Sequence, residues 1–222
     1  MISRINETDI RQRPIQRLPF TLVALALLIG FGIYGHTHVG PLDTELHHDA
    51  GYSTKLLLEG HLHRLLTSIL FTAGGWKFYA SLTMFAGAVG WVEWSQGTRR
   101  AMVTFFGIHL LTLLIVSLGI SLPLSAMQTL RGDLLYSIRD VGPSAGYYGC
   151  LGFGIASWKK WRTPVLSAVG VVLLSRLAWS AFHLPEDGHL LAADLAHAIA
   201  FPAGIIWAAL AARGCTDGLN SP

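Results

Sequence analysis

Charged residues and cysteines are scarce in this chain of 222 residues. Asp, Glu, Lys and Arg together make up 13% of it, about half of the roughly 25% usual in soluble domains. So few charges cannot cover a soluble surface, and the composition excludes a disordered chain or a coiled coil. The net charge of +3 is small, so we expect no nucleic-acid partner.

Cys150 and Cys215 are the two cysteines, and no Cys-x-x-Cys pair is present. A disulfide scaffold and a thiolate zinc site are therefore excluded. Hydrophobic residues, in contrast, make up 52% of the chain, and the mean hydropathy is +0.48. This composition predicts an integral membrane protein.

Six apolar stretches follow one another along the chain, at 18–35, 75–93, 101–122, 144–157, 164–182 and 190–212. A bilayer core about 30 Å thick takes about 20 apolar helical residues. The fourth stretch is the shortest and, at about 1.5 Å per residue, reaches only about 21 Å. We therefore predict an all-α membrane protein: a bundle of six transmembrane helices over 18–212, with a short fourth helix and tails at 1–17 and 213–222.

Basic residues are distributed unevenly between the two sides of this predicted bundle. If both termini are cytoplasmic, the outer loops carry only Lys55, Arg64, Arg131 and Arg139 of the basic residues outside the spans. The remaining ones fall on inner segments. The positive-inside rule therefore predicts a multi-pass protein of the cell or inner membrane with both termini in the cytoplasm.

The fourth stretch begins late, at Ser144, after a Gly142-Pro143 turn. Irregular backbone at membrane depth must be buried by protein or reached by water, and a serine there needs a base to act as a nucleophile. His197 lies about two turns into the sixth stretch, at a similar predicted depth, whereas His109 lies nearer the inner end. Ser144 and His197 are thus a candidate catalytic pair. The alternative is a serine that bonds to its own helix backbone.

Several spaced motifs together resemble those of rhomboid intramembrane serine proteases, over about residues 61–204. Gly142-Pro143-Ser144 with Tyr148 and Gly149 is similar to their fourth-helix motif, and His197 with Ala200 and Gly204 is similar to their sixth-helix motif. Glu93 with Gly97 resembles the end of the family's second helix. Arg64 with Thr67 resembles part of its first-loop motif.

The resemblance implies an intramembrane serine endopeptidase with a Ser144–His197 dyad. Its substrates would be single-pass or C-terminally anchored proteins of the lipid bilayer, cut near the outer membrane face. Tyr148 would stack on the His197 ring, while Gly142, Gly149 and Gly204 would serve the turn and the helix packing. Such a dyad implies neither cofactor nor metal. A rhombosortase-like enzyme that processes sorting anchors is a narrower form of this hypothesis.

The chain departs from the family in its second helix, where Lys77 and Ser81 occupy positions that usually hold His and Asn. Lys77 either donates to the oxyanion, with Ser81 as a further donor, or extends to the membrane interface. A third possibility is Lys77 as the base in place of His197. These departures keep open an alternative, a non-proteolytic rhomboid-like protein that binds transmembrane helices.

Arg176 and Asp194 are two further charges inside the apolar stretches. Charged residues at membrane depth tend to pair, so we expect an ion pair between the fifth and sixth helices. Asp194 also precedes His197 by three residues and lies on the same helix face, so it could orient the imidazole instead. The histidines of 36–64 show no fixed ligand spacing with an acid or a cysteine, and we predict no metal site.

Overall fold

The computed structural model describes residues 17–183 and 188–217, and most of this part of the chain is helical. Its β-type pairing is limited to two isolated bridges, Pro41 with Gly74 and Tyr52 with Asp140. The prediction of an all-α protein is therefore confirmed.

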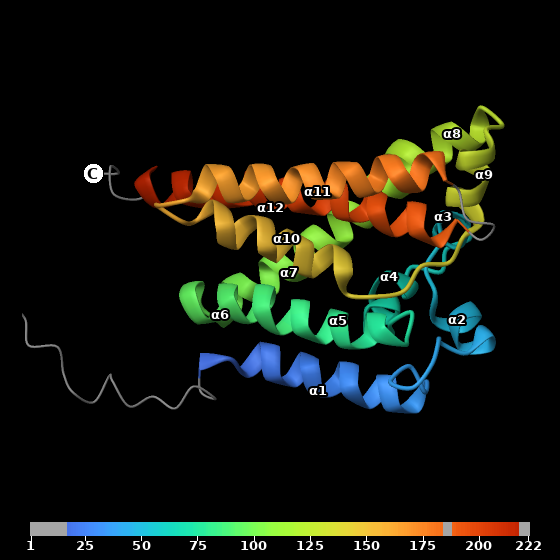
Figure 1. Ribbon diagram of the computed structural model, residues 1–222, viewed down its shortest axis with the longest axis horizontal. Helices are drawn as coiled ribbons and strands as arrows, with labels where there is room; N and C mark the ends of the chain where they lie inside the picture. The colour runs from blue at the N-terminus through green and yellow to red at the C-terminus, as the bar shows by residue number, and fades with distance from the viewer. Residues whose placement is uncertain (1–16, 184–187, 218–222) are drawn as a thin grey trace, which may run out of the picture.

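The long helical segments lie side by side along the length of the molecule, as Figure 1 shows. Helix α5 runs through the π-helix η4 into α6, and α7 runs through the π-helix η5 into α8. Consecutive segments alternate in direction, so α1 begins and α12 ends at the same end of the bundle (Figure 1). The bounds are α1 (Pro19–Tyr34), α5 (Trp76–Met84), η4 (Phe85–Val89), α6 (Gly90–Gln96), α7 (Thr98–Leu114), η5 (Ile115–Ser121), α8 (Leu122–Ala126), α10 (Ser144–Ala156), α11 (Arg162–Phe182) and α12 (His189–Asp217).

Three of these segments are long and apolar enough to cross a membrane, namely Thr98–Ala126, Arg162–Phe182 and His189–Ala212. Helix α1 is apolar but shorter. Helix α12 continues to Asp217. The predicted boundary between the membrane domain and the tail at 212 therefore falls inside a helix. Residues 1–16 and 218–222 of the predicted tails lie outside the described residues.

Short helices gather at the opposite end of the bundle, on the right in Figure 1. They form where the sequence predicted only polar connections. Side-chain caps explain three of them: Asp43 accepts the Glu45 and Leu46 N–H groups, Ser53 accepts that of Leu56, and Thr129 that of Gly132. Such caps satisfy donors that a helix start leaves without partners. These helices are α2 (Thr44–Ala50), α3 (Thr54–Leu58), α4 (Arg64–Thr67) with the 3-10 turn η3 (Ser68–Leu70), and α9 (Leu130–Ser137).

Glu93 at the end of α6 holds the start of α1. The carboxylate is 1% exposed and accepts the N–H groups of Phe20 and Thr21 at 2.9 and 2.7 Å. The hydroxyls of Thr21 and Thr98 donate to it as well, at 2.6 and 2.8 Å. A negative charge at a helix N-terminus is favourable, so Glu93 fixes α1 against the α6–α7 turn.

The main hydrophobic core lies where α1, η4, α7 and α10 meet. Phe85, Phe105 and Phe153 are buried there, together with Val89 and Cys150. Helix α12 packs on another side of α10 and makes its most extensive helix–helix contact. Helix α10 is thus held between this core and α12.

Candidate active site at the start of helix α10

A sharp turn places Ser144 at the first residue of α10. Gly142 adopts φ of +132°, a value that side-chain-bearing residues rarely adopt. Its N–H donates to the Ser68 carbonyl of η3 at 2.9 Å, and Pro143 follows as the cap residue. The Ser144 N–H belongs to the first turn, where a helix offers its donors no backbone acceptor. Ser144 therefore carries its hydroxyl beside an available amide donor.

Small residues bring the backbones of α10 and α12 together. A Cβ on Gly204 would overlap the Gly149 carbonyl, and one on Gly152 would overlap the Phe201 carbonyl. Ala145 and Ala200 are both buried, against Ile108 of α7. Close backbone approach is what small residues permit at helix contacts in membranes. Larger side chains at these positions would push α12 away from Ser144.

His197 of α12 lies in this contact, beneath the ring of Tyr148. The two ring centroids are 4.2 Å apart, with an angle of 32° between the ring planes. Both His197 nitrogens are buried and have no hydrogen-bond partner within the described residues, so the ring forms no hydrogen bond with Ser144 here. A buried imidazole without a partner is an unsatisfied polar group.

The register of the two helices brings Ser144 and His197 to one end. Tyr148 contacts His197, and Gly152, one turn later, meets Phe201, one turn after the histidine. Helices α10 and α12 therefore run in the same direction. Ser144 lies one turn before Tyr148, and helical side chains lean toward the N-terminus of their helix. The His197 ring thus leans toward the level of Ser144.

Arg176 of α11 and Asp194 of α12 form an ion pair next to His197. Arg176 Nε and Nη2 donate to Asp194 Oδ1 at 3.0 and 2.9 Å. The same oxygen lies 4.0 Å from His197 Nδ1, which is beyond hydrogen-bond distance. The Asp194 side chain is 5% exposed and that of Arg176 is 50% exposed. The carboxylate is thus bonded to Arg176 and not to the imidazole.

Lys77 and Ser81 lie on α5, but the structure does not bring them into a hydrogen bond with Ser144. Lys77 is exposed, and its charge acts on Asp140. The Ser81 hydroxyl interacts with that of Tyr147. A direct role for either side chain at the oxyanion therefore requires a rearrangement when substrate binds.

Asp140 is a site residue that the sequence reasoning missed. It precedes Ser144 by four residues, and its backbone pairs with Tyr52 through N–H···O bonds of 2.8 and 2.9 Å. Burial raises the pKa of its carboxyl to about 6, against opposing effects of the Val141 N–H and the Lys77 charge. The only sequence signal was an acid just before the Gly142-Pro143 turn. Asp140 ties this turn to the first loop.

The other histidines have structural partners or lie at the surface. His109 Nε2 lies 3.2 Å from the Leu65 carbonyl and so joins α7 to α4. The rings of His47 and His189 are 5.1 Å apart. Within the described residues, no three His, Cys, Asp or Glu side chains gather into a metal site.

No protein-family model and no curated protein matches this sequence. The geometry of α10 and α12 and the sequence motifs therefore carry the functional argument.

Proposed function

We propose that this protein is an intramembrane serine endopeptidase with a rhomboid-like bundle of six transmembrane helices. The observation that carries the proposal is the state of His197. It is buried, stacks on Tyr148 and has no hydrogen-bond partner in the part of the chain that the structure describes. The shared direction of α10 and α12, with Tyr148 one turn after Ser144 in contact with His197, also supports the proposal. A structural histidine in an apolar contact normally has a partner, whereas a general base needs a free nitrogen.

In the proposed reaction, Ser144 Oγ attacks the scissile carbonyl and transfers its proton to His197. The resulting oxyanion accepts from the Ser144 N–H at the start of α10, where the helix dipole also favours negative charge. Lys77 supplies a further donor once substrate is bound and the side chain moves toward the oxyanion. Collapse of the intermediate breaks the C–N bond, and His197 returns the proton to the leaving amine. Water then hydrolyses the acyl-enzyme by the same two transfers.

The same proposal assigns the topology. Helices α1, α5–α6 and α10 cross or enter the bilayer alongside the three long apolar segments, and both termini are cytoplasmic. Helix α10 has 13 residues, which at about 1.5 Å each cannot cross a core about 30 Å thick. Ser144, the first residue of α10, therefore lies below the outer membrane surface. Such a depth favours single-pass or C-terminally anchored proteins as substrates. Processing of sorting anchors is a narrower form of this proposed function.

A second candidate is a non-proteolytic protein that binds transmembrane helices. One observation favours it: His197 forms no hydrogen bond with Ser144 in this structure, so the serine has no base bonded to it. In this case the α10–α12 contact is structural, and its polar residues are not used for chemistry.

Cleavage of a single-pass substrate by the purified protein in liposomes separates the two candidates. Ser144→Ala and His197→Ala should each abolish cleavage. Ser157→Ala is the matched control, because Ser157 follows α10 and bonds to the Phe153 carbonyl; this variant should cleave normally. Equal cleavage by Ser144→Ala and wild type would reject the protease. Binding of the substrate without cleavage by wild type would support the second candidate.

A further inference from the structure

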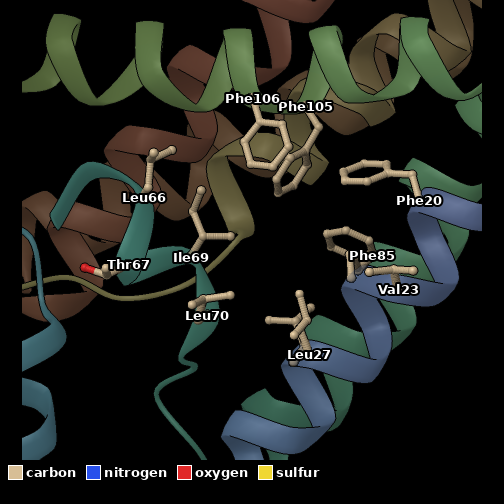
Figure 2. Close-up of a pocket in the computed structure, with 12 residues that line it drawn as sticks. Phe20, Val23, Leu27, Leu66, Thr67, Ile69, Leu70, Phe85, Phe105 and Phe106 are labelled. Atoms are coloured by element: carbon tan, nitrogen blue, oxygen red, sulfur yellow. The ribbon is translucent and has the colours of Figure 1, made fainter. Parts of the chain in front are cut away.

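An apolar cavity of about 320 Å³ opens between α1, the α4–η3 segment and α7. Figure 2 shows the side chains of Leu27, Leu66 and Ile69 directed toward it, with the rings of Phe85 and Phe105 beside them. Its floor is formed by residues of the main core, since Phe85 and Phe105 are each 1% exposed. Its rim is open, since Val23 is 60% and Leu66 52% exposed.

The lining determines what can fill this space. The hydroxyl of Thr67 is the only side-chain polar group among the lining residues, and none of them is charged. Water in such a cavity would lack hydrogen-bond partners. Phe105 lies seven residues into the Thr98–Ala126 span, hence about 10 Å from its start. The opening therefore faces the hydrocarbon interior of the bilayer.

We propose that this cavity binds one hydrocarbon chain of a membrane lipid. Its volume is about ten times the ~30 Å³ that a water molecule occupies in the liquid, which suits a segment of an acyl chain. A helix of a partner protein is about 10–12 Å across and does not fit. The rings of Phe20 and Phe105, with centroids 5.8 Å apart, lie at the cavity's α1–α7 side. A thin, flexible chain is the occupant that this shape admits.

The bound chain would also support the turn before Ser144. One wall of the cavity is the α4–η3 segment, whose Ser68 carbonyl accepts the Gly142 N–H at 2.9 Å. Phe105 also connects the cavity to α10, because it lines the cavity and fills the space next to Gly146. The cavity thus lies behind the candidate site. The lipid assignment itself does not depend on the proposed proteolysis.

Photo-cross-linking tests the assignment in the full-length protein. The protein is reconstituted with a phosphatidylcholine that carries a diazirine in one acyl chain, and the adducts are mapped by mass spectrometry. We expect adducts at Leu27, Leu66 and Ile69 to exceed those at Val171 and Val172 at least fivefold. Val171 and Val172 are apolar residues of α11 that are also exposed, so they report ordinary lipid contact.

Two variants of α1 provide a matched pair. Ala24 lines the cavity, whereas Ala26 is exposed and does not line it. Ala24→Phe should reduce the cavity adducts at least fivefold, and Ala26→Phe should leave them unchanged. Equal labelling of the cavity and of Val171 and Val172 in wild type would overturn the proposal, even if Ala24→Phe fails to fold. Cross-links between two copies of the chain at Leu66, in place of lipid adducts, would overturn it too.

Discussion

The ring of Tyr148 lies 4.2 Å from the ring of His197, centroid to centroid, and joins α10 to α12 within one turn of Ser144. This stack fixes the rotamer of an imidazole that has no hydrogen bond to any residue of the described ranges. The position of the His197 ring thus depends on its contact with Tyr148.

Tyr148→Phe keeps the ring and should cleave within about threefold of wild type. Tyr148→Ala removes the stack, and an aromatic pair contributes about 0.5–1.5 kcal/mol, so its turnover should fall about tenfold. Turnover and Michaelis constant measured in liposomes check this. An equal loss in both variants would show instead that the hydroxyl matters.

A second prediction concerns the Arg176–Asp194 pair. Asp194 is buried and Arg176 is half exposed, so Arg176→Gln leaves the more costly unpaired charge. Arg176→Gln should destabilise the protein by about 2 kcal/mol or more. Asp194→Asn should destabilise it by less, and the double variant by less than the sum of the two single effects. Thermal unfolding in detergent completes this double-mutant cycle. Strictly additive effects would show that the two side chains do not interact energetically.

Lys77 is the subject of the third prediction. Removal of one oxyanion donor typically lowers turnover about 100- to 1,000-fold. Lys77→Met keeps the apolar stem and should lower turnover on that scale while the Michaelis constant and stability change little. Lys77→His should recover part of the loss. Cleavage by Lys77→Met within about threefold of wild type would show that Lys77 is an exposed surface charge and not an oxyanion donor.

Asp140 makes the stability depend on pH. Its pKa is about 6 in the folded protein and about 3.9 in the unfolded chain. Between these values the folded state binds the proton and the unfolded state does not, so stability falls as pH rises from about 4 to about 6 and is level above. Among the described residues, the Lys77 charge acts on this carboxyl, and the carboxyl acts in turn on the Tyr147 hydroxyl.

Asp140→Asn removes this titration without a change of shape. The difference in unfolding temperature between wild type and Asp140→Asn should therefore grow with pH over that range. The comparison is needed because other groups titrate nearby; for example, burial lowers the pKa of His47. A difference that stays constant from pH 4 to 7 would show that Asp140 has an ordinary pKa.

The sequence predicted the elements that depend on local pattern. The late start of α10 at Ser144 followed from Gly142 and Pro143, and the charges of Arg176 and Asp194 within apolar stretches indicated that they pair. The all-helical architecture followed from apolar stretches of helical length. In each case a property of a few neighbouring residues, or the cost of charge in a membrane, determines the outcome.

Long-range relationships were not accessible in this way. The sequence gives no sign that Glu93 accepts the first N–H groups of α1, or that the Lys77 charge acts on Asp140, because these residues come near one another only after the helices pack. The small helices of 36–64 were missed even though Asp43 and Ser53 are ordinary N-cap residues. Polar composition had favoured a loop there.

Fluorophosphonate labelling is the most direct test of the central claim, that Ser144 is a nucleophile activated by His197. The reagent forms a covalent adduct with activated serines and requires no knowledge of the substrate. We predict labelling of the wild-type protein in liposomes at Ser144, its loss in Ser144→Ala and His197→Ala, and its retention in Ser157→Ala. Absence of labelling in the folded wild type, or undiminished labelling in His197→Ala, would contradict the account.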